Sequence, residues 1–348
     1  MDQNSLPRYR TGDAGLDRAV LEIIEEANAP EQPDLLFEMV VSALRMARER
    51  VGRGDMKLVN SALKELRYSF HVFAPYREVK KCSIFGSART KPHEAAYSCA
   101  REFGKAMVDQ DWMVITGAGP GIMAAGLEGA GTENSFGVNI ELPFEAEANE
   151  FIVDDHKLIN FRYFFTRKLT FMKESHGYAL MPGGFGTLDE TFELLTLMQT
   201  GKTYLAPVVL LDPPGDTYWD TWRDFVVKEL LEPGYINGTD LKLVHITDDI
   251  PEAVNEICHF YSSYHSMRFV GKRLVLRLNR EPSDAELAQL TKEFAPITVS
   301  GGVERVTASQ SEIDDDDHVD LPRIAFHFDR HGNDKLRLMI DHLNDGGA

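Results

Sequence analysis

Short apolar runs alternate with stretches of helical periodicity along the middle of the chain. The runs are Cys82–Gly86, Trp112–Thr116, Phe136–Ile140, Tyr178–Met181 and Pro207–Leu211. Strands that are apolar throughout are buried on both faces, as happens in parallel sheets covered by helices. The pattern therefore predicts an α/β fold with a Rossmann-like, doubly wound parallel sheet.

The segment before the first apolar run has a different periodicity. Leu16, Val20, Ile23 and Ile24 repeat at helical spacing, and so do residues between Leu35 and Ala47. We therefore predict an N-terminal helical segment over residues 1–78, followed by a Rossmann-like catalytic domain over residues 79–268.

The remaining residues, 269–348, are predicted to form a small α+β module with a possible regulatory role. Its expected elements, in the order βαββα, are a strand at Arg273–Leu278, a helix at Asp284–Phe294, strands at Ile297–Ser300 and Arg323–Phe328, and a helix at Asp334–Leu343. The acidic run Asp314–Asp317 is interpreted as a solvated loop, with metal binding as the less favoured alternative.

The charge balance limits the partners of the protein. The formal net charge of the 348 residues is −18, which leaves no domain-wide basic surface for a nucleic acid polymer. No stretch is long and apolar enough for a membrane span, and Cys82, Cys99 and Cys258 form no Cys-x-x-Cys pair. We therefore expect a cytoplasmic protein with reduced thiols, no membrane association and no metal site.

A glycine-rich turn joins the fourth apolar run to a predicted helix. The turn contains Gly183, Gly184, Gly186 and Thr187 within Pro182–Thr187. Unpaired N–H groups and the positive end of the helix dipole attract anions at a helix N-terminus, and glycines let a phosphate approach the main chain. A tight turn without a ligand is the alternative, but three glycines with a threonine favour a phosphate site.

Two further turns follow predicted strands. Thr116–Met123 contains Gly119 and Gly121, but the dinucleotide fingerprint fails because Ile122 stands where its last glycine belongs. Gly201–Thr203 resembles the end of a P-loop yet follows a helix, so it is discounted. The turn Gly86–Arg89 contains Ser87 and ends the first strand. Because carboxyl ends of parallel strands share one edge, the three turns are expected to converge there.

Charged side chains accompany these turns. Glu190 lies one helical turn after Gly186 and Thr187, so we expect its carboxylate to project beside a bound phosphate. Arg167 and Lys168 follow the aromatic run Phe161–Phe165. By themselves these residues fit a role in the reaction and a purely structural role equally well. In the structural role, Glu190 is a helix N-terminal carboxylate, and Arg167 and Lys168 form a solvated basic face.

The motifs together resemble the Lonely Guy (LOG) phosphoribohydrolases, a family often labelled as lysine decarboxylases. The hallmark Pro-Gly-Gly-x-Gly-Thr-x-x-Glu runs from Pro182 to Glu190, and further matches are Gly119–Met123, Asn139–Pro143 and Phe164–Lys168. The similarity covers roughly residues 80 to 265, in the form of the longer bacterial branch. The helical N-terminal segment and the C-terminal module are departures from the short members.

The resemblance implies hydrolysis of the N-glycosidic bond of a nucleoside 5′-monophosphate, AMP-like or a cytokinin riboside monophosphate, to a free base and ribose 5-phosphate. It implies Arg167 and Glu190 as catalytic residues, no cofactor and a homo-oligomer, dimeric or larger. The substrate and phosphate contacts that it implies, together with the neighbouring lysine, are Ser87, Gly119, Gly121, Met123, Lys168, Gly183, Gly184, Gly186 and Thr187.

Other functions stay open at this point. A non-catalytic carrier of a phosphorylated ligand, such as the molybdenum cofactor, would use the same fold and phosphate turn. An NAD-dependent oxidoreductase is disfavoured by the broken fingerprint. Lysine decarboxylation is disfavoured because pyridoxal phosphate needs a Schiff-base lysine and a partner for its ring nitrogen, and only Lys168 lies in the core motifs.

Overall fold

The predicted parallel sheet is confirmed by the computed structural model, which describes residues 8–28, 31–141 and 148–346. Its strand order is β4-β3-β2-β1-β5-β6-β7, and every neighbouring pair is parallel. The strands are β1 (Lys81–Phe85), β2 (Met113–Thr116), β3 (Ser135–Ile140), β4 (Leu158–Phe161), β5 (Gly177–Leu180), β6 (Val208–Leu211) and β7 (His245–Thr247). The five apolar runs form the five central strands of this sheet.

The two edge strands, β4 and β7, were not expected from the sequence. Edge strands have one neighbour and part of their surface faces solvent, so they need not be apolar throughout. Asn160 in β4 is exposed, and His245 and Ile246 in β7 are half-buried. These residues interrupt the apolar pattern on which strand prediction relies.

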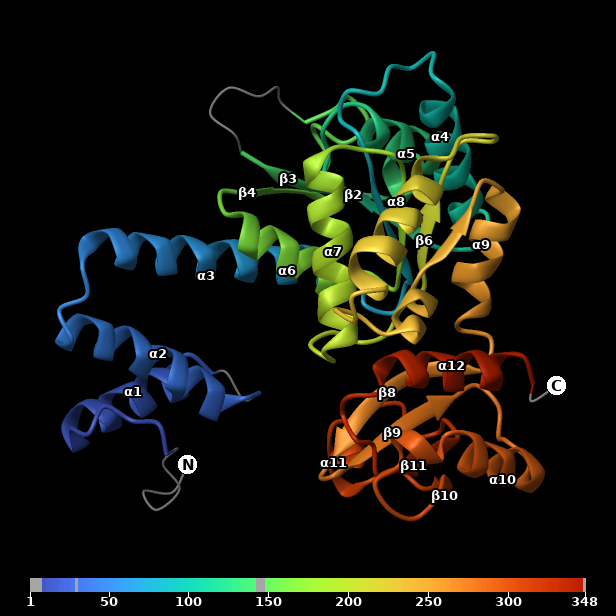
Figure 1. The fold of residues 1–348 in the computed structure, drawn as a ribbon. Helices are drawn as coiled ribbons and strands as arrows, with labels where there is room; N and C mark the ends of the chain where they lie inside the picture. Colours follow the sequence, from blue (N-terminus) through green and yellow to red (C-terminus); the bar gives the residue numbers. More distant parts are fainter. Residues whose placement is uncertain (1–7, 29–30, 142–147, 347–348) are drawn as a thin grey trace. The chain divides into compact units, whose positions relative to one another are not determined.

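Helices cover both faces of the sheet, as a doubly wound fold requires (Figure 1). One face packs against α4 (Ala95–Val108), α5 (Ile122–Ala130) and α9 (Ile250–His259). The other face packs against α6 (Phe164–Glu174), α7 (Phe185–Gln199) and α8 (Tyr218–Val226). Strand residues alternate between these cores, with Ile84 on the first face and Phe85 on the second.

The chain divides into two compact units, Met1–Glu65 and Leu66–Ala348. The first unit contains α1 (Ala14–Glu26), α2 (Pro33–Arg48) and the start of α3 (Arg53–Phe73). Val20 and Ile24 of α1 bury against Phe37 and Val41 of α2, so these two helices cover part of each other's apolar stripes, whereas Ile23 is exposed. In the second unit, the last turn of α3 contributes Val72 and Phe73 to the core on the face of the sheet that α6, α7 and α8 cover.

The C-terminal part of the second unit is an antiparallel sheet of order β10-β11-β9-β8 with three helices. Its elements are β8 (Tyr264–Val270), β9 (Arg273–Leu278), α10 (Asp284–Glu293), β10 (Glu304–Val306), α11 (Gln310–Asp314), β11 (Arg323–Phe326) and α12 (Asn333–Asn344). The order is therefore ββαβαβα, and the expected βαββα order is wrong.

The strand expected at Ile297–Ser300 is the main error in that order. Ala295–Ile297 forms a 3₁₀ turn containing Pro296, and Thr298 then makes an isolated bridge with Phe328. Proline has no N–H for a ladder, which favours the turn over a strand. The edge strand β10, with two exposed residues, provides the pairing for β11 instead.

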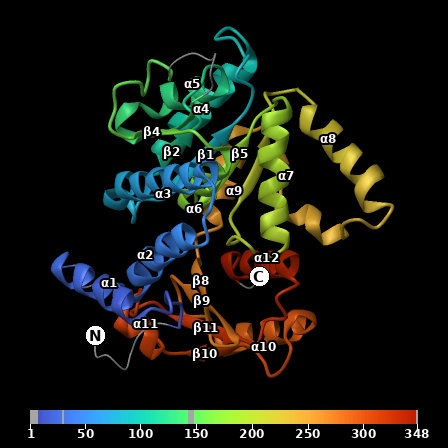
Figure 2. The same cartoon turned by 90° about the vertical axis from the view of Figure 1, so that its left-hand side faces the viewer.

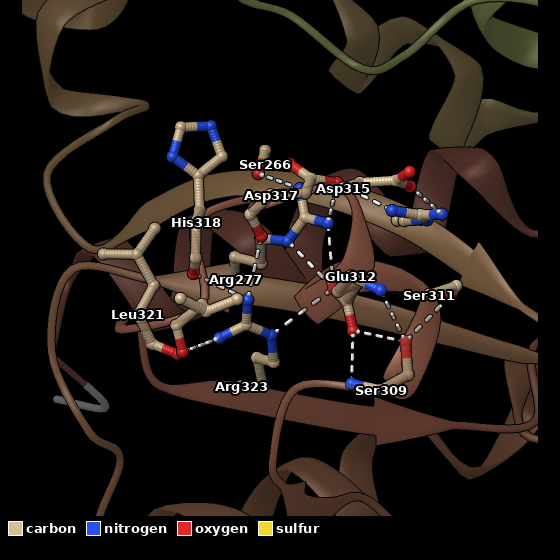
Figure 3. A network of polar contacts seen from close by, with 12 residues as sticks. Ser266, Arg277, Ser309, Ser311, Glu312, Asp315, Asp317, His318, Leu321 and Arg323 are labelled. Atoms are coloured by element: carbon tan, nitrogen blue, oxygen red, sulfur yellow. Dashed lines mark hydrogen bonds and ion pairs between the residues drawn. The ribbon is translucent and has the colours of Figure 1, made fainter. Parts of the chain in front are cut away.

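The acidic run is solvated at Asp314, Asp315 and Asp316, as expected, but Asp317 is half-buried and joins a network of ion pairs (Figure 3). Asp317 accepts from Arg277 at 2.5 Å and from Arg268 at 2.8 Å, while Arg277 also pairs with the buried Glu312 at 2.8 Å. Arg323 approaches the same Glu312 carboxylate at 3.4 Å. The run therefore closes a network of ion pairs over the C-terminal sheet.

The two sheets of the second unit share a continuous apolar core to which α12 contributes. Figure 2 shows α12 below the end of α7. Leu336, Met339 and Ile340 of this helix join the core that also contains residues of α7 and β9. Arg337 of α12 pairs with Glu256 of α9 at 2.5 Å. Within the described ranges, no helix combines the length and the apolar character needed to cross a bilayer.

Candidate functional site

The candidate site lies where the strand order of the parallel sheet reverses. β1 and β5 are adjacent and parallel, and the chain winds outward from β1 to β4 on one side and from β5 to β7 on the other. The loops that leave β1 and β5 therefore diverge at their carboxyl ends. Open α/β sheets bind their ligands at such a switch point.

Backbone hydrogen bonds join the three predicted turns at this edge. Ser87 N–H donates to the carbonyl of Pro182 at 3.2 Å, and Ile122 N–H donates to the carbonyl of Ser87 at 3.0 Å. The Ser87 hydroxyl accepts from Arg89 N–H at 3.1 Å, which stabilises its own turn. The structure thus places the turn after β1 between the other two.

Two glycines in these turns are required by close contacts. Gly121 has φ +70°, and a Cβ there would overlap with the carbonyl oxygen of Ser87. A Cβ on Gly183 would overlap with Oγ1 of Thr187 in the following helix. A side chain at Gly121 would push apart the turns after β1 and β2, and a side chain at Gly183 would disturb the junction between its own turn and α7.

Glycine is not required in this way at positions 184 and 186. A Cβ on either would meet no atom of the described residues within 4 Å, and neither has a positive φ. Gly186 lies in the first turn of α7, where alanine would be more favourable than glycine by up to about 1 kcal/mol. The N–H groups that begin α7 have no intrahelical acceptors, so these two positions leave open a surface of backbone donors.

Glu190 lies one turn further along α7 and is 7% exposed. Its Oε2 atom is buried and has no hydrogen-bond partner among the described residues. Burial raises the pKa of Glu190 to about 7, and the nearby positive charges of Lys168 and Arg167 oppose this rise. A carboxyl group of this kind changes its protonation state near neutral pH.

Arg167 of α6 extends toward the turn after β2. Its Nε donates to the carbonyl of Val138 at 2.8 Å, and its guanidinium lies 5.3 Å from the centre of the Phe171 ring. A Cβ on Gly117 would overlap with Arg167 Nη2 and would lie 2.6 Å from Met123 Sδ. Arg167 and Met123 therefore meet over this glycine turn.

Lys168 points to other partners. Its Nζ lies 2.7 Å from Asp189 Oδ2 and 2.6 Å from Glu193 Oε2, and its side chain is 14% exposed. These ion pairs join α6 to α7. The two carboxylates lie before and after Glu190 in the sequence. In the structure, Lys168 is thus a link between helices whose charge also acts on Glu190.

Three residues near these turns were missed by sequence reasoning. Tyr218 donates its hydroxyl to the carbonyl of Gly183 at 2.7 Å, and Asn149 donates to the carbonyl of Gly119 at 2.9 Å. Asp212, directly after β6, accepts from Trp219 N–H at 3.0 Å. Only Asp212 had a signal in the sequence, as an acidic residue at the carboxyl end of an apolar strand.

Sequence comparison finds related proteins for this domain. Residues 120–257 match a family model described as possible lysine decarboxylase. A cytokinin riboside 5′-monophosphate phosphoribohydrolase of Mycobacterium tuberculosis is 27% identical over 175 residues, which are 48% of this chain and 88% of that protein. A pyrimidine/purine nucleotide 5′-monophosphate nucleosidase of Escherichia coli K12 is 28% identical over 152 residues, 40% of this chain but 33% of that protein.

A solved structure is similar to about half of the chain. It is the molybdenum cofactor carrier protein of Chlamydomonas reinhardtii, with 20% identity and a TM-score of 0.36, covering 51% of this chain and 94% of that one. The family match and the two sequence relatives confirm the resemblance to the LOG family.

Proposed function

We propose that the site hydrolyses the N-glycosidic bond of a nucleoside 5′-monophosphate. The observation that carries this proposal is the placement of Glu190 one turn after an open helix N-terminus. Its carboxyl group is buried, and one oxygen has no hydrogen-bond partner among the residues that the structure describes. The names of the two sequence relatives support the same substrate class. In this proposal α7 supplies both the phosphate site and the reactive carboxylate.

The 5′-phosphate would bind the backbone N–H groups at Gly184, Gly186 and Thr187. The open space above the two glycines supports this placement, because a phosphate oxygen needs that space to reach the main chain. The dipole of the fifteen-residue α7 adds a favourable field for the dianion. Ser87 and the Gly119–Met123 turn would contact the rest of the nucleotide.

The reaction needs stabilisation of positive charge on the sugar. As the bond from C1′ to the base nitrogen breaks, the base takes the electron pair and the ribose acquires oxocarbenium character. Ionised Glu190 would stabilise that charge and orient a water molecule. Water then adds to C1′ and its released proton balances the departing base, which gives the free base and ribose 5-phosphate.

Arg167 would fix the sugar against Glu190 by binding the phosphate or a ribose hydroxyl. Its position beside Gly117 and Met123 supports this role, because Gly117 lies in the turn after β2 and Met123 in the first turn of α5. A guanidinium offers several donors in a rigid plane and so orients an oxygen-rich ligand well.

The test is a panel of nucleoside monophosphates, including a cytokinin riboside monophosphate, incubated with pure protein and assayed for free base and ribose 5-phosphate. Adenosine is included beside AMP. We expect base release from at least one monophosphate and a kcat/KM for adenosine at least about tenfold below that for AMP, because adenosine lacks the phosphate contacts.

Two results would contradict the proposal. Binding of monophosphates without release of any base would indicate a non-catalytic carrier of a phosphorylated ligand. Equal kcat/KM values for AMP and adenosine would remove the phosphate from substrate recognition. Glu190→Gln protein, purified in the same way, controls for contaminating nucleosidases.

A further inference from the structure

Tyr218 connects α8 to the glycine turn that precedes α7. Its hydroxyl donates to the carbonyl of Gly183 at 2.7 Å, across 35 residues of sequence. The Tyr218 ring lies edge-on to Trp219, with 4.9 Å between ring centres, and Trp219 is fully buried. Packing therefore fixes the position from which the hydroxyl reaches the turn.

This hydrogen bond determines how one peptide group is oriented. The carbonyl of Gly183 and the N–H of Gly184 belong to the same planar trans peptide and point in opposite directions. Neither residue has a Cβ, so this peptide can rotate more easily than others, and a rotated peptide would present its carbonyl oxygen to an anion. A donor that holds the carbonyl on one side directs the Gly184 N–H to the other.

We infer that Tyr218 is a positioning residue for phosphate binding, which aims the Gly184 N–H at the 5′-phosphate by holding the Gly183 carbonyl. This inference rests on the proposed function. It assigns α8 a part in substrate recognition, although no residue of α8 belongs to the glycine motif.

Asp212 fixes the start of α8 and thereby the position of Tyr218. β6 ends at Leu211, and Asp212 Oδ2 accepts from Trp219 N–H at 3.0 Å in the first turn of α8. Thr217, the residue before the helix, makes no side-chain cap, so Asp212 supplies this cap from a distance. Asp212 is 3% exposed and its other oxygen has no hydrogen-bond partner in the described ranges. The buried carboxylate thus anchors the helix that carries Tyr218.

The main experiment compares Tyr218→Phe with wild type. Phenylalanine keeps the ring and removes only the hydroxyl. The Kd for ribose 5-phosphate and the KM for AMP should rise about three- to tenfold, which is the effect of losing one neutral hydrogen bond. The Kd for adenosine, which has no phosphate, should stay within about twofold of wild type. Tyr235→Phe is the matched control, since Tyr235 is 77% exposed and lies outside the site.

Asp212→Ala tests the second link through a double-mutant cycle. We expect Asp212→Ala to weaken ribose 5-phosphate binding, and to add little once Tyr218 is already phenylalanine, because both changes act on the same contact. Additive losses would overturn the link between Asp212 and Tyr218.

Other outcomes separate this inference from the proposed function. Unchanged ribose 5-phosphate and AMP binding in Tyr218→Phe, or equal weakening of AMP and adenosine, would overturn the positioning role. Wild-type protein that binds AMP but releases no base would defeat the proposed hydrolysis, while the ribose 5-phosphate titrations would still decide the role of Tyr218.

Discussion

Lys168 Nζ lies 2.6 Å from Glu193 Oε2 and also pairs with Asp189, so this lysine is engaged by two carboxylates of α7 other than Glu190. Glu190 lies between these partners in the sequence and keeps a buried oxygen without a hydrogen-bond partner in the described part of the chain. The positive charge of Lys168 still favours the ionised form of Glu190, but burial opposes it more strongly. Glu190 is thereby held as a carboxyl group that titrates near neutral pH.

Glu190→Gln should lower kcat for base release at least about a hundredfold, because the amide keeps the shape but removes the charge that stabilises the sugar cation. The Kd for AMP should change by less than about threefold. Steady-state assays of base release and calorimetric titration with AMP measure the two effects. Glu229→Gln, an exposed carboxylate outside the site, is the control. Retention of more than a tenth of wild-type kcat would exclude the proposed role.

The activity should rise with pH up to about 7. The pKa of Glu190 is raised to about 7 by burial, and the ionised form is the active one, so kcat/KM should fall about tenfold per pH unit below this value. A pH profile of AMP hydrolysis between pH 5.5 and 8.5 tests this. A midpoint near 6 would instead reflect the second ionisation of the substrate phosphate.

Glu190 should also make the fold less stable at high pH. Its folded pKa of about 7 exceeds the ordinary 4.5, so the folded state binds this proton more tightly than the unfolded state does. The contribution of this proton to the free energy of unfolding is complete below pH 4.5 and is lost as the pH rises through 7. Glu190→Gln should therefore exceed wild type in free energy of unfolding by about 3 kcal/mol at pH 8, and by about half of that at pH 5.5.

Chemical denaturation of both proteins at the two pH values measures this difference. A gap that does not change with pH would mean that Glu190 is not desolvated in the folded protein.

Substitutions of two glycines in the phosphate turn should separate the effect on folding stability from the effect on AMP binding. Gly186→Ala adds a Cβ in open space within a helix, so its free energy of unfolding should equal or exceed that of wild type by up to about 1 kcal/mol. Its Kd for AMP should rise at least about tenfold, because the new Cβ lies where the phosphate approaches. Gly183→Ala should lose both stability and binding, since its Cβ overlaps with Thr187. Wild-type AMP affinity in Gly186→Ala would contradict the phosphate placement.

We expect the protein to be a homo-oligomer, at least a dimer. Phe164, Phe165 and Leu169 of α6 are about half exposed, and Phe185 at the start of α7 is 93% exposed. Apolar side chains gathered on neighbouring helices are typical of an interface between subunits. Size exclusion with light scattering at micromolar and submicromolar concentration measures the mass in solution. A monomer with full activity would contradict this expectation.

The local parts of the site were predictable from the sequence. Strand β5, the glycines that follow it and Glu190 lie within fourteen consecutive residues, and their types specify a buried strand, a turn and a helix start without reference to the rest of the chain. Arg167 was assigned to the site only through the resemblance of its motif to the LOG family. The central strands were equally clear, because burial on both faces requires an unbroken apolar run.

The sequence by itself thus determined the central strands of the parallel sheet and the junction of strand, glycine turn and helix that contains Glu190. The tertiary structure decided that Lys168 pairs with Asp189 and Glu193, that Asp317 joins an ion-pair network, and that Tyr218 holds Gly183. The physical reason is the separation along the chain over which each interaction acts. Burial periodicity and turn chemistry act between neighbours along the chain, whereas the partner of a side chain, the desolvation of Glu190 and the pairing of an edge strand depend on which distant segments meet in space.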